Sequence, residues 1–312
     1  MRVDVVITAG DGRAAKKVFM RNKALLEVDG KAIIRHIVEV LLSCDEIGRI
    51  MVVGPKTKFE AVIGGLAVDI IEQKRSLMEN GWGGFLQTIP EYRQSGILTE
   101  EVVQKYRDKY VLGMSGDIPL ITAGEIKEFV AQCDMERYDY VAGITSEEIL
   151  KQFGPRKGMP GIKMATFHVR DGNFRQNNLH MVKPFKLRNS IDLGLKVYEY
   201  RYQKELVNII KIMIEIIKLG PGHIGKTLWL YLLLQISTGL SSLGLKPLAK
   251  ITSYPVTRAE LERLISSILD ARFKIVETTI GGAALDVDNE QDFLILSLRY
   301  KDWMRMIGHH LA

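Results

Sequence analysis

The sequence predicts an α/β protein with a doubly wound, mostly parallel sheet and one helical insertion. Three observations lead to this fold class. Short β-branched segments alternate with segments in which apolar residues recur at helical spacing. The first strand-like segment runs directly into a glycine-rich turn. Over residues 189–248 two long helical patterns replace the alternation, so the α/β core is expected to be interrupted there.

The predicted core elements follow one another in the order typical of such a fold. Residues 3–8 are mostly β-branched and predict the first strand, while apolar residues three and four apart predict a helix over residues 31–43. Further strands are predicted at residues 50–53, 68–71, 110–114, 138–144, 162–169 and 274–279. These patterns do not determine the order of the strands in the sheet.

The insertion, residues 189–248, is predicted to separate two parts of one α/β core, residues 1–188 and residues 249–312. Its first helix has an apolar face opposite a charged face that extends to Lys218, and Gly220-Pro221-Gly222 ends it. A second helix begins near Lys226 and is more apolar than the first. The insertion is therefore expected to be helical throughout.

The second predicted helix has no charged residue between positions 227 and 245. It is marginal for crossing a bilayer, because serine, threonine and glutamine residues dilute its hydrophobicity. We expect residues 189–248 to pack on the core, to form a homodimer contact, or to lie on a membrane surface. The sequence leaves these three hypotheses open.

Composition and charge restrict the function. The 312 residues are 46% hydrophobic, and 43 basic against 37 acidic side chains give a net charge of +6. This excess suits phosphate-bearing substrates but forms no dense basic run, so we expect no nucleic-acid partner. Cys44 and Cys133 lie far apart and indicate neither a disulfide framework nor a zinc site. We expect a cytoplasmic protein without a targeting segment, peripheral to the membrane if the insertion binds lipid.

Two N-terminal segments indicate phosphate binding. The first strand is followed by Ala9-Gly10-Asp11-Gly12-Arg13, where the missing Cβ atoms of glycine let backbone N–H groups surround phosphate oxygens. A tight turn without a ligand is an equally good interpretation of this segment alone. Lys23 follows shortly afterwards and, held by the apolar residues behind it, could reach a triphosphate as a fixed positive charge.

Two acidic segments follow predicted strands. Gly116-Asp117 comes after the strand at 110–114, and open α/β sheets bind ligands at the carboxyl ends of their strands. Asp286 and Asp288 come after the last strand, and alternation puts them on one face. Either segment could instead begin a helix, with Asn289 as the cap of the second one.

Taken together, the four segments resemble nucleotidyltransferases of the GT-A fold, which is Rossmann-like, and most closely the molybdenum-cofactor guanylyltransferase-like and sugar-phosphate branches. The family pattern Ala-Gly-x-Gly-x-Arg, Lys-x-Leu and Gly-Lys-Pro-Leu-Ile is similar to residues 9–13, 23–25 and 30–34. Its Gly-Asp-x-Pro-Leu-Ile-Thr is matched without a gap by residues 116–122. Its closing Asp-x-Asp-Thr-x-x-Asp resembles residues 286–292, with asparagine in place of threonine.

The resemblance implies an enzyme that joins a nucleoside triphosphate to a phosphorylated small molecule and releases pyrophosphate. It implies Mg²⁺ held by Asp117 and Asp288, and a triphosphate neutralised by the catalytic residues Lys23 and Arg13. The residues implied to bind the nucleotide are Ala9, Gly10, Asp11, Gly12, Gln73, Ser76, Asn80 and Gly116. The residues that fall where the family binds its acceptor are Arg175, Gln176, Asn177, Asn178 and Lys183. Asn177, Asn178 and Lys183 are the implied contacts, and a polar surface loop is the alternative.

The chain departs from the family pattern in its first loop. The family leaves one residue between its second glycine and the arginine, whereas Gly12 and Arg13 are adjacent. Arg13 could therefore point elsewhere and leave Lys16 or Lys17 to take its place. The insertion is absent from compact family members, which indicates an unusual acceptor side.

Three other functions stay open at this point. Residues 220–227 match the Walker A pattern of P-loop NTPases and kinases, although the segment before them is predicted to be a helix rather than a strand. A GT-A glycosyltransferase is the second alternative, but such enzymes carry a mid-chain Asp-x-Asp where this chain has Gly116-Asp117. A non-catalytic nucleotide-binding descendant is the third, because the first loop is short.

Overall fold

The structure of the protein is a computed structural model. It describes residues 2–12, 17–190 and 254–309. Between the last two ranges it also describes positions 229, 232, 233, 236, 237, 239, 240, 248, 251 and 252. Most of the predicted insertion, including the Walker A-like residues 220–227, lies outside the described residues, as does Arg13.

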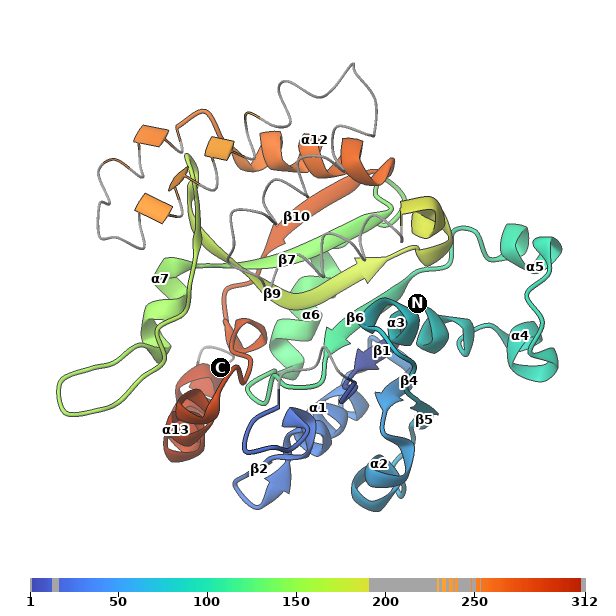
Figure 1. Ribbon diagram of the computed structural model, residues 1–312, viewed down its shortest axis with the longest axis horizontal. Coiled ribbons are helices and arrows are strands. Elements are labelled where there is room, and N and C mark those ends of the chain that lie inside the picture. Colours follow the sequence, from blue (N-terminus) through green and yellow to red (C-terminus); the bar gives the residue numbers. More distant parts are fainter. Residues whose placement is uncertain are drawn as a thin grey trace.

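Within the described chain, eight strands form the central sheet in the order β10-β7-β9-β6-β1-β4-β5, with β8 paired to β9 (Figure 1). Neighbours pair in parallel except β9, which runs antiparallel to β6, β7 and β8. The predicted doubly wound, mostly parallel sheet is confirmed. The strands of this sheet are β1 (Val3–Thr8), β4 (Ile47–Gly54), β5 (Asp69–Glu72), β6 (Val111–Ser115), β7 (Tyr140–Ser146), β8 (Phe167–Val169), β9 (Gly172–Val182) and β10 (Phe273–Glu277), and β2 (Glu27–Val28) pairs with β3 (Lys31–Ala32) outside it.

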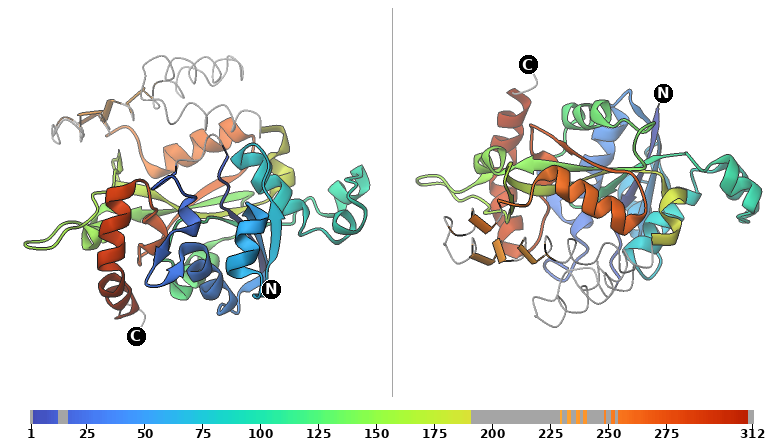
Figure 2. Two further views of the ribbon diagram at one scale, coloured as in Figure 1. Left: turned by 60° about the horizontal axis from the view of Figure 1, so that its bottom comes forward. Right: turned by 90° about the horizontal axis from the view of Figure 1, so that it is seen from above.

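Helices cover both faces of the sheet, and Figure 2 shows α6 and α12 on opposite sides. Their apolar residues recur at helical spacing because only one side of each helix meets the sheet. The α-helices are α1 (Ile33–Leu42), α2 (Lys56–Ile63), α3 (Leu77–Leu86), α4 (Pro90–Ser95), α5 (Glu100–Lys105), α6 (Ala123–Gln132), α7 (Glu147–Leu150), α12 (Arg258–Leu269) and α13 (Glu290–His309). The 3-10 turns are η1 (Lys23–Leu25), η2 (Lys151–Phe153), η3 (Pro184–Ser190) and η4 (Gly282–Ala284).

Side-chain alternation along the central strands gives the two faces different cores. On one face Val5 of β1 and Leu112 of β6 join a large cluster with residues of α1, α6 and α13. On the other face Val6 packs with α3 and α5, and Ala142 of β7 packs with α12 in a separate cluster. β6 and β9 lie between those two groups of helices, and this is where the cavity described below forms.

β9 is the main element that the sequence patterns did not predict. Its polar segment around Arg175 was interpreted as either an acceptor site or a surface loop, yet it is an 11-residue strand in the middle of the sheet. The strand predicted over 162–169 is wrong except for β8. Ile162 is buried in the core, and its N–H donates to the Phe153 carbonyl oxygen at 2.9 Å. It is apolar because this one residue packs in the core, not because it belongs to a strand.

The described positions of the predicted insertion include both buried and exposed side chains. Leu233 packs in the cluster that contains Leu261 of α12, whereas Trp229 and Ile236 are exposed. In the described part of the chain, no helix combines the length and the apolar character needed to cross a membrane. The boundaries of the insertion, and its contact with a second subunit or a membrane surface, stay predictions.

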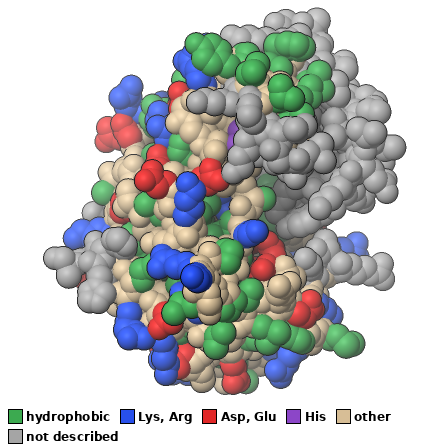
Figure 3. Space-filling view, turned by 90° about the vertical axis from the view of Figure 1, so that its left-hand side faces the viewer, with side chains coloured by type: hydrophobic (Ala, Val, Ile, Leu, Met, Phe, Trp, Pro, Cys, Tyr) green, Lys and Arg blue, Asp and Glu red, His purple; other side chains and the backbone are tan. Residues whose placement is uncertain are grey.

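Charged side chains of both signs are interspersed on the face drawn in Figure 3. This distribution agrees with the small net charge of +6. A protein that binds a nucleic-acid backbone usually gathers lysine and arginine along one face. The described residues form no such basic stripe on the face shown, and the expectation that nucleic acid is not a partner stays a prediction.

Candidate active site

A cavity of about 450 Å³ opens at the carboxyl ends of β1 and β6. It continues along the face of β6 and β9 toward α3, where Trp82 and Val182 line it. Residues 10–12, Lys23 and the turn at Asp117 form its polar end together with Asp286 and Asp288. Ligands of open α/β sheets bind at this edge, so the cavity lies where the fold places a site.

The loop after β1 is held from behind by two amide side chains. Gln73 accepts a hydrogen bond from the Asp11 N–H (2.7 Å) and donates one to the Asp11 carboxylate (2.5 Å). A Cβ atom on Gly10 would lie 2.9 Å from the side-chain nitrogen of Asn80, so glycine is needed there. The bond from Gln73 lowers the pKa of Asp11, and an ion pair with Lys58 (3.1 Å) acts in the same direction.

Lys23 lies in the 3-10 turn η1, which is capped by Asn22. The buried side chain of Asn22 accepts a hydrogen bond from the Ala24 N–H and donates one to the Ala9 carbonyl oxygen, both at 2.8 Å. Ala24 and Leu26 are buried in the core behind the lysine. The turn is thereby tied to the end of β1, and the Lys23 side chain reaches the cavity.

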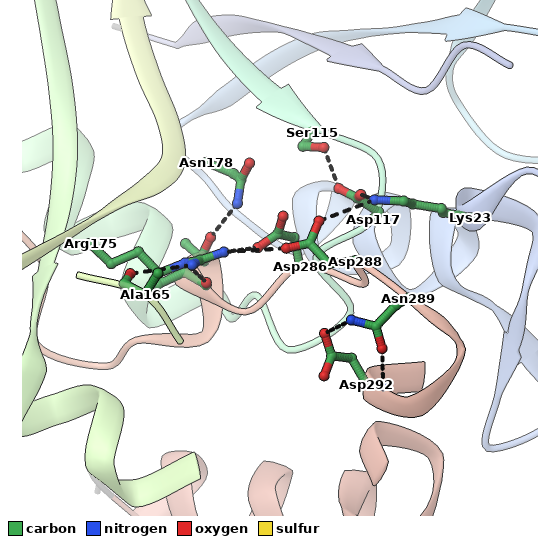
Figure 4. Close-up of polar contacts among 12 residues, drawn as sticks. Lys23, Ser115, Asp117, Ala165, Arg175, Asn178, Asp286, Asp288, Asn289 and Asp292 are labelled. Atoms are coloured by element: carbon green, nitrogen blue, oxygen red, sulfur yellow. Dashed lines mark hydrogen bonds and ion pairs between the residues drawn. The ribbon is translucent and has the colours of Figure 1, made fainter. Parts of the chain in front are cut away.

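The Lys23 ammonium joins two carboxylates from distant parts of the sequence. Its Nζ lies 3.1 Å from Asp117 Oδ2 and 3.5 Å from Asp288 Oδ1 (Figure 4). Burial alone would lower the pKa of Lys23, but the carboxylates of Asp117 and Asp288 raise it, so the lysine stays charged. Burial raises the pKa of Asp117, and Lys23 opposes that shift. The Ser115 hydroxyl donates a further hydrogen bond to Asp117.

Asp286 is paired with a different cation. Arg175 of β9 donates from Nη2 to Asp286 Oδ1 at 2.7 Å, and the same nitrogen lies 3.8 Å from Asp288 Oδ2. Its Nε donates to the Ala284 carbonyl oxygen at 3.0 Å. Arg175 therefore neutralises Asp286 and fixes the loop that leads to α13. Asp288, whose side chain is 46% exposed, is left at the cavity wall.

Residues 5–159 match the family model of the MobA-like NTP transferase domain. This chain belongs to the nucleotidyltransferase superfamily. The nucleotidyltransferase domain begins with β1 and includes the glycine loop, Lys23 and the Asp117 turn. Asp286 and Asp288 lie beyond the matched residues and reach the same site through the fold.

Solved structures support the same fold for this nucleotidyltransferase. A hypothetical transferase from Thermus thermophilus shares 19% identity, covers 94% of this chain and 99% of that one, and has a TM-score of 0.61. A 4-diphosphocytidyl-2C-methyl-D-erythritol synthase from Anaerococcus prevotii shares 9% identity, with 96% of each chain covered and a TM-score of 0.50. Identities this low show the fold alone. No curated protein matches the sequence.

Most residues that the sequence assigned to the site line the cavity of the nucleotidyltransferase. Ser76 caps α3 and forms a capping box with Glu79, which fixes the start of the helix beside the loop. Gln73 stands behind the loop rather than on the cavity wall. The predicted nucleotide-binding and acceptor-binding residues that line the cavity are Ala9, Gly10, Asp11, Gly12, Ser76, Asn80, Gly116 and Asn178. Arg13 and Lys16 lie outside the described residues, whereas Lys17, named as a substitute for Arg13, lines the cavity.

Two of the predicted acceptor residues do not line the cavity. Asn177 is buried and donates a hydrogen bond to the Thr278 hydroxyl oxygen (3.1 Å). Lys183 is buried between Asp108 and Asp139, each at 3.4 Å from its Nζ. From Asn177 to Met181 the odd-numbered side chains of β9 are buried, whereas Asn178, His180 and Val182 line the cavity, because adjacent side chains of a strand alternate between faces. Lys183 follows the end of the strand. Asn177 and Lys183 are therefore not candidates for contact with the acceptor.

The structure gives Arg175, which the sequence places in the acceptor segment, a different partner, and it adds His180, which sequence reasoning missed. Arg175 is the cation of Asp286, and His180 lines the cavity next to Asn178 on the same face of β9. The Tyr140 hydroxyl and His180 Nδ1 are hydrogen-bonded at 3.0 Å. Recognising the segment as a strand would have identified His180, since positions 178, 180 and 182 then share one face.

Proposed function

We propose that this nucleotidyltransferase uses Mg²⁺ to join a nucleoside triphosphate to a phosphorylated small molecule, with release of pyrophosphate. The observation that carries the proposal is the meeting of Lys23, Asp117 and Asp288 beside a glycine-rich loop. One ammonium lies within 3.1 Å and 3.5 Å of two carboxylates at the edge where such sheets bind ligands. A charged group held in this way can neutralise a polyphosphate.

The chemistry requires alignment rather than a strong base. An oxygen of the acceptor phosphate attacks the α-phosphorus, the bond from that phosphorus to the α,β-bridging oxygen breaks, and pyrophosphate leaves with the electron pair. The acceptor phosphate is already ionised, so no side chain has to remove a proton. Lys23 keeps its positive charge between its two carboxylates and stabilises the negative charge on the phosphate oxygens.

The residues present fit a magnesium ion. Mg²⁺ in nucleotide-dependent enzymes is usually held by one or two carboxylates, while substrate phosphates and water complete its octahedral shell. Asp117 and Asp288 supply such a pair, because both approach the same ammonium. In the described part of the chain, His, Cys, Asp and Glu form no group of three or more that could hold a metal. When bound, Mg²⁺ would offset charge on the α-phosphate and on pyrophosphate.

The remaining walls of the cavity suggest how the substrates lie. Residues 10–12 line the cavity, and the Asp11 N–H is already bonded to Gln73, so the Gly10 and Gly12 N–H groups are our candidates for contact with phosphate oxygens. Ser76 and Asn80 line the cavity at the start of α3, and we assign them to contact with the base of the nucleotide. Asn178 lies on the β9 side, beyond Asp288, and is our candidate for contact with the acceptor. Lys17 is the described cation that could serve in place of Arg13.

Pyrophosphate release is the test of this proposal. Each of the four ribonucleoside triphosphates is first screened with Mg²⁺ by thermal unfolding, where a ligand at a hundredfold over its Kd stabilises by roughly 2.7 kcal/mol. The nucleotide that binds is then assayed with a panel of sugar phosphates and polyol phosphates, with Asp117→Asn as the inactive control.

Three results would count against the proposal. Binding without pyrophosphate release on any acceptor would favour a non-catalytic descendant. Release of a nucleoside diphosphate from a nucleotide sugar, without pyrophosphate, would favour a glycosyltransferase. Full activity after removal of divalent metal by a chelator would exclude the role of Mg²⁺.

A further inference from the structure

Behind the active site, a fully buried glutamate connects the two loops that carry its aspartates. Glu125 lies in the first turn of α6, soon after Asp117, and is 0% exposed. Its carboxylate accepts hydrogen bonds from the Ala283 N–H (2.9 Å), the Gly281 N–H (3.2 Å) and the Thr278 hydroxyl (2.9 Å). A residue of α6 thus binds the loop that follows β10.

That loop is pressed directly against the Asp117 turn. Gly281 has a φ of +88°, which favours glycine, and a Cβ on Gly282 would lie 2.0 Å from the Leu120 carbonyl oxygen. Further along, the Val287 N–H donates to the Asp117 carbonyl oxygen at 3.1 Å. Because the loop after β10 and the Asp117 turn are in direct contact, a change in the Glu125 hydrogen bonds moves one of them relative to the other.

The hydrogen bonds continue from Glu125 into β9. The Thr278 hydroxyl donates to Glu125, and its oxygen accepts a hydrogen bond from Asn177 Nδ2 at 3.1 Å. Asn177 fits against Gly143, where a Cβ atom would lie 2.2 Å from its Oδ1. The amide that the sequence assigned to the acceptor therefore belongs to this buried network.

The reaction proposed above gives Glu125 no chemical role, although burying a carboxylate is unfavourable unless its oxygens are well bonded. Its neighbours Ile126 and Phe129 are core residues, and an apolar side chain would fill the same space without that penalty. We infer that Glu125 is a positioning residue that sets the separation of Asp117 and Asp288, and thereby the affinity of the site for a divalent metal. The inference rests on the proposed function, because it takes these two aspartates as the metal ligands.

The test compares two glutamates of the same helix. Glu125→Gln keeps the shape but places an amide N–H₂ where a carboxylate oxygen accepts a backbone or hydroxyl hydrogen. Glu128→Gln is the matched control, since Glu128 also accepts from the loop, at the Thr279 N–H (3.1 Å), but from the protein surface. Binding of Mn²⁺ is measured by electron paramagnetic resonance in the presence of a non-hydrolysable triphosphate. Half-saturation by Mg²⁺ is measured in the pyrophosphate assay.

For Glu125→Gln we expect about tenfold weaker Mn²⁺ binding, the lower end of what loss of a group behind a metal ligand usually causes. The Mg²⁺ concentration for half-maximal turnover should rise by the same factor, while KM for the nucleotide at saturating metal stays unchanged. Glu128→Gln should match the wild type in every measurement. Thr278→Val removes one of the three hydrogen bonds to Glu125, together with the contacts of that hydroxyl to Asn177 and Thr145, and should give a smaller shift in the same direction.

Unchanged Mn²⁺ binding in Glu125→Gln would overturn the inference, as would an equal loss in Glu128→Gln. If Glu125→Gln does not fold, Thr278→Val tests the inference in its place. Mn²⁺ binding equal to that of the wild type in Thr278→Val would then overturn the positioning role of Glu125. A wild-type protein that binds Mn²⁺ and triphosphate but releases no pyrophosphate would refute the proposed function alone. In that case weaker Mn²⁺ binding in Glu125→Gln would still support the positioning role.

Discussion

The two loops that carry the active-site aspartates are fixed by different kinds of contact. The turn after β6 is held mainly by its own neighbours: Ser115 donates to Asp117, and Thr122 caps α6 through the Glu125 N–H (3.2 Å). The Asp117 side chain is only 15% exposed, and its carboxylate pairs with the distant Lys23. Two backbone hydrogen bonds also link this turn to distant segments, from the Gly116 N–H to the Thr8 carbonyl oxygen and from the Val287 N–H to the Asp117 carbonyl oxygen, both at 3.1 Å. Local side chains therefore cap and orient the turn, while its place beside the second loop depends on the fold.

The loop after β10 is fixed by side chains from elsewhere in the chain. Asn178 and Arg175 bind the carbonyl oxygens of Ala283 and Ala284 across 105 and 109 residues of sequence, and Glu125 reaches the Ala283 N–H across 158 residues. Asp288 at the end of this loop is 46% exposed. Of the two proposed metal ligands, Asp117 thus has local side chains at its turn, whereas the loop of Asp288 is held mainly by residues distant in sequence.

The largest effects should come from the two aspartates themselves. Asp117→Asn removes a metal-binding charge from the enclosed end of the site, and pyrophosphate release should fall by roughly 10³-fold, the upper range for loss of one preorganised group. Asp288→Asn changes a half-exposed side chain and should reduce it by roughly 10²-fold. Both variants should unfold at the wild-type temperature. Near-normal release in both would show that the metal assignment is wrong, and the opposite order would contradict the comparison.

Lys23 joins the two loops electrostatically, so its removal should affect both aspartates. Lys23→Ala should reduce kcat/KM by roughly 10²-fold, or about 3 kcal/mol of transition-state stabilisation. Lys31→Ala serves as the control, because Lys31 pairs with Glu39 on the surface (2.7 Å). Steady-state kinetics of the two variants check this prediction, and equal activities would remove Lys23 from the catalytic residues.

Arg175 tests how strongly the second loop depends on distant contacts. Arg175→Lys keeps the charge near Asp286 but cannot also donate to the Ala284 carbonyl oxygen in the same geometry, because lysine lacks the planar guanidinium. Turnover should fall by about tenfold, the smaller end of the effects seen behind metal ligands. Wild-type kinetics in this variant would mean that the Asp286 contact alone holds the loop.

Glu125 should link the second loop to the pH dependence of stability. Burial raises the pKa of Glu125 to about 7, from an ordinary value near 4.5, despite the opposing hydrogen bond from Ala283. The folded protein then holds the proton more tightly than the unfolded chain. The free energy of unfolding should therefore decrease as pH rises from 4.5 to 7, by on the order of 3 kcal/mol.

Thermal unfolding across that pH range measures the effect. The glutamine of Glu125→Gln cannot ionise. The Tm of this variant minus the Tm of the wild type should therefore increase as pH rises from 4.5 to 7. Because the variant exchanges a buried charge for a mismatched hydrogen bond, the two proteins should have similar stability near pH 8. Parallel Tm curves over the whole range would show that Glu125 does not titrate in the folded protein.

The smallest effect is expected outside the two loops. If the triphosphate lies between Lys23 and Asp117, the Walker A-like residues 220–227 have no part in binding it, and Lys226→Ala should be almost silent. Nucleotide binding by thermal shift and pyrophosphate release both check this. If Lys226→Ala loses nucleotide binding while Lys23→Ala binds normally, the nucleotide binds at residues 220–227 and the P-loop alternative is correct.

The sequence by itself determined the fold class and the positions of the charged centre. β1, α1 and β6 show the periodicity of buried elements, and Lys23, Asp117 and Asp288 belong to short contiguous patterns. Such patterns can be recognised from the sequence because each requires only a local backbone conformation. The three are a glycine turn after a strand, a capped 3-10 turn, and an aspartate before a helix. The Asn289 cap of α13, one of the two alternatives for its segment, is local in the same sense, and its Oδ1 accepts from the Asp292 N–H at 2.9 Å.

Only the tertiary structure decided which polar side chains face the cavity and what holds the second loop. The sequence treats Asn177 and Asn178 alike, but β9 turns them to opposite faces of the sheet, and its pairing with β6 and β7 fixes which face each one takes. Glu125 has the sequence signature of an ordinary first-turn helix residue. It contacts the Gly281 and Ala283 N–H groups only because β10 passes beside α6, and such long-range pairings leave no local pattern to read.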